Sequence, residues 1–187
     1  MKHCKAFLFL GRSVSPLKSA EGIGLELDGY NNLADTFELV KRVVKRFLNR
    51  HRAGLMLGLV NLGMKRGYFI GALYPVGSNI IVMNKAPLKI AMEKTEKRVY
   101  NAYCFLLLLH EYLHSLGYLN EERVQELTEE VCDLALGPSH PATVMAKKGV
   151  AAYFPHVAHF STDTRLPSNA TVELVRDFDK SSATYIQ

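Results

Sequence analysis

Apolar side chains in residues 32–52 recur every three or four positions, which is the spacing of one helix face. The apolar members of this segment are Leu33, Phe37, Val40, Val43, Val44, Phe47 and Leu48. The other side of the same helix carries the basic residues Lys41, Arg42, Lys45, Arg46, Arg50 and Arg52. We therefore expect an amphipathic helix that buries one face in the domain and exposes a solvated basic face.

Three shorter apolar runs follow this helix. They read AGLMLGLVNLG (53–63), GYFIGALYPV (67–76) and SNIIVMNK (78–85), and a glycine-flanked turn, GMKRG, joins the first two. Runs rich in Ile, Val, Phe and Tyr that are separated by Gly, Pro and Asn are typical of strands. The pattern predicts a small meander of antiparallel strands.

Helical patterns return after the strands. Pro87 opens a helical region that extends to Gly117, with a break near residue 96. Asn120 is the expected N-cap of a further helix, 121–136, whose apolar face comprises Val124, Leu127, Val131 and Leu134. Residues 138–187 are expected to form an extension that packs on the core of the domain. The order of a helix, three strands and further helices predicts an α+β fold. We expect a single domain, 1–187, with its core at about residues 53–136.

Composition narrows the classes of protein that fit. The chain has 187 residues, 48% of them hydrophobic, and a formal net charge of +5. Nucleic-acid binding is not expected, because no nucleic-acid-binding motif accompanies the mild positive charge. Three scattered cysteines, Cys4, Cys104 and Cys132, suit a reducing compartment, and the last two are expected as small buried side chains. The apolar runs are too short for a signal peptide or a membrane span, so a cytoplasmic protein is expected.

The chemistry of the chain is concentrated in the segment LLLLHEYLHSLGYLNEE, 106–122. His110, Glu111 and His114 form an HExxH sequence. Residues four apart lie on one helix face, so both imidazoles can bind one zinc ion. Glu111 lies beside the ion, where it can take a proton from metal-bound water. The surrounding leucines predict a buried helix, in which these polar residues need a shared partner. Tyr112 points away from the metal face and is expected to be structural.

The HEYLH sequence, on a buried helix after strands and before a glutamate-bearing helix, resembles the zincin metallopeptidases, in particular small gluzincins of the minigluzincin kind. The resemblance covers about residues 53–136. It implies a zinc-dependent endopeptidase with a small antiparallel or mixed sheet packed on the active-site helix. It also implies that a peptide or protein substrate pairs with an edge strand, for which we nominate 78–84 or 67–74.

The third zinc ligand is not evident from the motif. The related HExxHxxGxxH pattern is half present: Gly117 matches its glycine, but Asn120 stands at its third-ligand position. A neutral amide is a poor zinc ligand, so Asn120 is expected to be a helix cap. Met145 in ATVMA matches the methionine turn of that pattern, although a lone methionine is more typical of core packing.

The gluzincin pattern instead takes its third ligand from a downstream helix. The sequence EEVCD supplies Glu129 with Asp133 four residues later, and Asp133 would then support His110 as a hydrogen-bond acceptor. Glu129 is the nominated ligand. Glu130, Glu121 and His140 are left open as alternatives, with Asn120 as a less favoured one. His156 and His159 are expected to be packed or surface histidines. Alternatively, they could donate hydrogen bonds to the oxyanion of the transition state, or act as metal ligands that block the site.

Three functions follow from these observations. The first is a zinc metallopeptidase in which Glu111 is the general base and His110 and His114 are ligands. The second is a catalytically latent zincin-fold module that binds metal and regulates or recognises a partner. The third is a basic interaction protein in which the HExxH sequence has arisen by chance.

Overall fold

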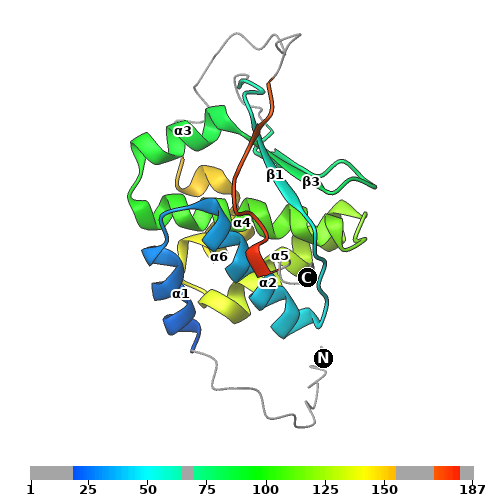
Figure 1. Cartoon of the computed structure of the whole chain (residues 1–187). Coiled ribbons are helices and arrows are strands. Elements are labelled where there is room, and N and C mark those ends of the chain that lie inside the picture. Colours follow the sequence, from blue (N-terminus) through cyan, green and yellow to red (C-terminus); the bar gives the residue numbers. More distant parts are fainter. Residues whose placement is uncertain (1–18, 65–69, 155–170, 182–187) are drawn as a thin grey trace.

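The structure, a computed structural model, describes residues 19–64, 70–154 and 171–181. These residues form an α+β fold of six α-helices and a four-stranded mixed sheet (Figure 1). The helices are α1 (Ala20–Gly29), α2 (Leu33–Leu48), α3 (Lys85–Lys94), α4 (Lys97–Ser115), α5 (Glu121–Leu136) and α6 (Pro141–Lys148), with a 3-10 turn, η1 (Val150–Ala152). The strands are β1 (Met56–Val60), β2 (Ala72–Leu73), β3 (Ile80–Asn84) and β4 (Glu173–Leu174).

The sheet differs from the predicted meander. Its strand order is β2-β3-β1-β4, and β1 pairs with β3 in parallel, with Leu57 opposite Ile81. The prediction of consecutive antiparallel pairing was therefore wrong for the first run, which pairs with the third run rather than with the second. Turn signals are local, whereas pairing depends on burial: Leu57, Ile81 and Met83 are fully buried, and the two strands that carry them lie side by side in the sheet interior.

Strands β2 and β3 form the one antiparallel hairpin of the predicted kind. Ala72 pairs with Met83, and the connecting turn contains Gly77, whose φ of +83° is readily accessible only to glycine. Strand β2 lies at an edge of the sheet, whereas β3 is an inner strand. Of the two segments nominated to pair with a peptide, only 67–74 thus contains an edge strand, and its residues 67–69 lie outside the described residues.

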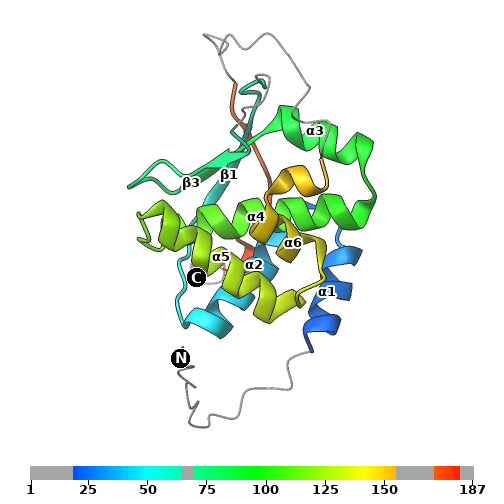
Figure 2. The ribbon, with the colours of Figure 1, turned by 180° about the vertical axis from the view of Figure 1, so that it is seen from behind.

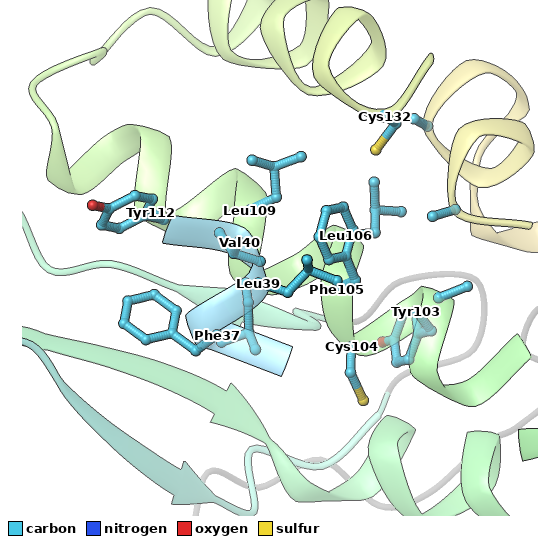
Figure 3. Close-up of a cluster of buried hydrophobic side chains, with 14 of the residues drawn as sticks. Phe37, Leu39, Val40, Tyr103, Cys104, Phe105, Leu106, Leu109, Tyr112 and Cys132 are labelled. Carbon is cyan, nitrogen blue, oxygen red and sulfur yellow. The ribbon is translucent and has the colours of Figure 1, made fainter. Parts of the chain in front are cut away.

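Helix α4 runs through the middle of the molecule and packs against α1, α2, α3, α5 and α6 as well as β2 and β3 (Figures 1 and 2). Most of its large apolar side chains are buried, and Figure 3 shows Tyr112 near Phe37 of α2 and Phe105 and Leu109 near Leu39 and Val40 of the same helix. The predicted break near 96 is confirmed, because α3 ends at Lys94 and α4 begins at Lys97. The motif helix is therefore the buried helix that the sequence predicted.

The predicted amphipathic helix at 32–52 corresponds to α2, but three basic residues depart from the prediction. Helix α2 ends at Leu48, so Arg50 and Arg52 lie beyond it, and Arg52 is half-buried, with hydrogen bonds to the Tyr74 hydroxyl and to the backbone oxygens of Ser78 and Ser115. Arg42, Lys45 and Arg46 are exposed, as expected for a solvated face. Lys41 is only 8% exposed and forms ion pairs with Glu38 and with Asp179. Lys41 was misassigned because its partner Asp179 lies 138 residues further along the chain, where no helical periodicity could reveal it.

The C-terminal residues return to the start of the domain. Strand β4 pairs antiparallel with β1, and the Phe178 ring stacks on Phe37 with centroids 4.1 Å apart. The Asp179 carboxylate also accepts hydrogen bonds from the backbone N–H groups of Gly54 (2.6 Å) and Leu55 (3.0 Å). Residues 171–181 are thus fixed to the entry of β1, and this contact was not predicted.

Two smaller expectations also have outcomes. Cys104 and Cys132 are buried, as predicted, while Cys4 lies outside the described residues. Leu134 is 52% exposed and so does not belong to the buried face of α5, unlike Val124, Leu127 and Val131.

Within the described part of the chain, no helix combines the length and the hydropathy that crossing a membrane requires.

Candidate metal centre

His110 and His114 lie one turn apart on α4, and their rings meet edge to face with centroids 4.9 Å apart. The two Nε2 atoms are 3.2 Å apart, and the side chains are 20% and 16% exposed. Both ring nitrogens therefore reach the surface of the domain from a helix whose other faces are buried. This is the arrangement that the four-residue spacing predicted.

Glu121 completes the group from the next helix. One carboxylate oxygen lies 2.9 Å from Nε2 of His110, and the other lies 3.2 Å from Nε2 of His114. The described residues thus contain a group of three side chains that could hold one metal ion. Its members are His110, His114 and Glu121, whose ligand atoms lie within 4.8 Å of one another. Glu121 was one of the open alternatives for the third ligand.

The turn between α4 and α5 places Glu121 beside the histidines. Gly117 has a φ of +96°, a left-handed conformation that lets the chain reverse after α4. Asn120 then caps α5, because its side chain accepts a hydrogen bond from the backbone N–H of Arg123 at 2.8 Å. The predicted cap is thus confirmed, and it makes Glu121 the first residue of α5, next to the end of α4.

A second contact fixes the orientation of His114. Its Nδ1 lies 2.8 Å from the backbone oxygen of Tyr118 in the same turn. A carbonyl oxygen can only accept, so Nδ1 carries the proton and Nε2 presents its lone pair to His110 and Glu121. Hydrogen bonds of this kind are typical of histidines that bind metals.

The donor set fits zinc. Zinc bonds of about 2.0–2.1 Å at tetrahedral angles separate neighbouring ligand atoms by about 3.3 Å. The two Nε2 atoms are 3.2 Å apart, close to this value, and the two different Glu121 oxygens lie 2.9 Å from Nε2 of His110 and 3.2 Å from Nε2 of His114. Burial lowers the pKa of His110, which the nearby Glu121 carboxylate partly offsets, and a lower pKa favours the neutral imidazole that binds metals. Two histidines and a carboxylate would leave one zinc position for water.

Glu111 lies on the neighbouring face of α4 and is almost completely buried, with 6% of its surface exposed. Burial, together with the Glu121 carboxylate, raises the pKa of Glu111 to about 7, although a hydrogen bond from the Tyr74 backbone acts in the opposite direction. With His110, Glu111 lines a cavity of about 490 Å³. A carboxyl group that titrates near neutral pH and faces a cavity can accept or donate a proton there.

The structure places the nominated ligand Glu129 and its partner Asp133 elsewhere. Glu129 is one of the cavity-lining residues and accepts a hydrogen bond from Gln125, while Asp133 pairs with Lys147 at 3.1 Å. The reason is the short turn between α4 and α5. It places the first residue of α5 beside the histidines, and the later turns of α5 lie farther from them.

The remaining candidates have other positions. Glu130 is exposed, and His140 is 3% exposed at the N-cap of α6, where its Nδ1 accepts from the N–H of Ala142 at 3.2 Å. Nε2 of His140 lies 3.4 Å from Asp28, so this histidine links α1 and α6. His156 and His159 lie outside the described residues.

Some residues that line the cavity were not singled out by any sequence pattern. Gln125 and Thr128 come from α5 and Lys147 from α6, and α6 itself was not predicted. The available signal was Pro141 directly after His140, since proline is common in the first turn of a helix. Met145 is buried and lines the cavity, so core packing describes it better than a methionine turn.

Comparison of the chain with protein-family models, with curated proteins and with solved structures finds no match.

Proposed function

We propose that this protein is a zinc-dependent metallopeptidase with His110, His114 and Glu121 as metal ligands and Glu111 as general base. The observation that carries the proposal is the position of Glu111. Its buried carboxyl group lies next in sequence to a metal ligand and lines the same cavity as that ligand. A structural ion pair between a glutamate and two histidines would not require a second, buried carboxyl group with a raised pKa.

The residues of the chain have separate roles in this reaction. Bound zinc would polarise the peptide carbonyl and lower the pKa of a water molecule. The Glu111 carboxylate takes one proton from that water as its oxygen bonds to the carbonyl carbon. Glu111 then gives the proton to the amide nitrogen, the C–N bond breaks, and an acid and an amine leave. The place of Glu111 in the cavity wall beside the ligand His110 would let it do both.

A peptide is the preferred substrate because of the neighbouring strand. Gly71 and Ala72 line the cavity that Glu111 and His110 also line, and β2 is an edge strand of the sheet. An extended peptide that pairs with β2 would lie across this cavity. The resemblance of the HEYLH segment to the zincins supports the same substrate class.

The test uses the full chain, because residues 171–181 contribute β4 and the Asp179 contacts to the fold. Protein purified without chelator is assayed for zinc, and casein cleavage is compared for wild type and Glu111→Gln. We expect one zinc per chain in both and cleavage only by wild type. Zinc without cleavage would instead indicate the latent metal-binding module, and protein without zinc would indicate the basic interaction protein.

A further inference from the structure

The cavity beside the candidate metal centre is lined by residues that have no role in the proposed reaction. It occupies about 490 Å³ between α4, α5, α6 and residues 70–72, and His110 and Glu111 lie in its wall. Apolar side chains supply much of the lining: Ile70, Ala72, Leu106, Leu107, Met145 and Val150. Such a surface accommodates the hydrocarbon part of a substrate side chain.

One carboxylate in this cavity lacks a basic partner among the described residues. Glu129 is half-buried, and its side chain receives a hydrogen bond from Gln125 at 3.1 Å. The same Gln125 amide donates to the backbone oxygen of Ala146 at 2.7 Å, which holds it between α5 and α6. The charge of Glu129 is therefore positioned in the cavity but not neutralised.

The lysine of the cavity lining is already paired with another carboxylate. Lys147 also lines the cavity, but its ammonium group pairs with Asp133 at 3.1 Å. Glu111 is the second carboxyl group of the lining. With Lys147 paired to Asp133, Glu129 has no basic partner among the described residues, and a cation that enters the cavity would pair with it.

We infer that this cavity binds a lysine or arginine side chain of the peptide substrate and that Glu129 is the specificity-determining residue. The inference rests on the proposed function, since it names the substrate class of that site. The methylene stem of the substrate residue would pack on the apolar lining, and its cation would pair with Glu129. This would also account for the position of Glu129, which faces the cavity rather than the histidines.

The first experiment measures binding without turnover. Zinc-loaded Glu111→Gln protein is titrated with two alanine-rich octapeptides that differ at one position, which holds lysine or norleucine. Norleucine keeps the hydrocarbon stem and removes the charge. We expect about tenfold tighter binding of the lysine peptide, and a difference of less than about twofold after the additional change Glu129→Gln. The matched control is Glu130→Gln, on the exposed side of the same helix, which should keep the tenfold preference.

The second experiment maps cleavage sites that wild type and Glu129→Arg produce in casein. Wild type should cut beside basic residues, and Glu129→Arg should lose this preference. Equal binding of the two octapeptides, or an unchanged preference in Glu129→Gln, would overturn the inference while leaving the metallopeptidase proposal intact. Conversely, if wild type cleaves nothing but the lysine preference in binding persists and depends on Glu129, the cavity assignment stands and the proposed activity fails.

Discussion

The Glu121 carboxylate lies 2.9 Å from Nε2 of His110, although the two residues belong to different helices. The turn at Gly117 and the cap at Asn120 bring them together. The Glu121 side chain is 71% exposed, so its position toward the histidines fits both the proposed metal ligand and a surface ion pair. The following predictions separate these two explanations.

Replacing Glu121 by Gln should weaken zinc binding by at least about 100-fold, because a ligand is lost rather than an outer hydrogen bond, which typically costs about 10- to 100-fold. Affinity is measured by competition with a chromogenic chelator. Glu122→Gln is the matched control, since it removes the same charge from the same first turn of α5. Equal affinities in the two variants would show that Glu121 is not a ligand.

The helix cap offers a test of how the site is positioned. Asn120 and Asn32 cap α5 and α2 with equivalent hydrogen bonds, each 2.8 Å from a backbone N–H. Replacing either by Ala should lower the free energy of unfolding by about 1 kcal/mol. Only Asn120→Ala should also weaken zinc binding, because only that cap fixes the first turn that holds Glu121. Similar zinc affinities in both variants would contradict this role, and urea unfolding checks the stability of each.

Local sequence signals predicted the helices of the site and their ends. The α5 bounds, the Asn120 cap and the break before α4 all follow from caps, breakers and apolar spacing within a few residues. The same local logic identified His110, Glu111 and His114 as neighbours on one helix. These features depend on interactions that span about one helical turn, so one sequence is sufficient to predict them.

Long-range contacts could not be predicted in this way. The parallel pairing of β1 with β3, the return of β4 and the burial of Lys41 each join residues far apart in the chain. The contact of Glu121 with the histidines was not predicted for a different reason. Residue spacing does not indicate how sharply the chain turns after Gly117. The gluzincin spacing therefore favoured Glu129, which the structure places in the cavity instead.

The raised pKa of Glu111 predicts a pH-dependent stability in the metal-free protein. Its pKa is about 7 in the fold against 4.5 ordinarily, so the folded state keeps a proton that the unfolded state releases. Stability from this group is therefore present below about pH 4.5 and is lost as pH rises toward 7. The gain from Glu111→Gln should grow by about 1 to 3 kcal/mol over that interval. Urea unfolding in EDTA at pH 5 and pH 8 measures it, and a pH-independent gain would exclude the shift.

The last prediction concerns the anchor of the C-terminal residues. Asp179 is 4% exposed and binds Lys41 as well as the backbone N–H groups of Gly54 and Leu55. Replacing it by Asn removes the charge that compensates buried Lys41 but keeps a residue that tolerates the positive φ of 59°. We expect a loss of about 2 kcal/mol in the free energy of unfolding, because Lys41 retains Glu38 as a partner.

The neighbouring Lys180 supplies the control for this anchor. Its ion pair with Asp35, at 2.9 Å, joins the same two segments but lies on the surface, so Lys180→Ala should change stability little. Denaturant unfolding compares the two variants with wild type. Because β1 lies directly after Gly54 and Leu55, loss of the Asp179 contacts should also expose the β1 and β4 amides to faster hydrogen exchange. If Asp179→Asn and Lys180→Ala behave alike in both measurements, the buried ion pair does not anchor the segment.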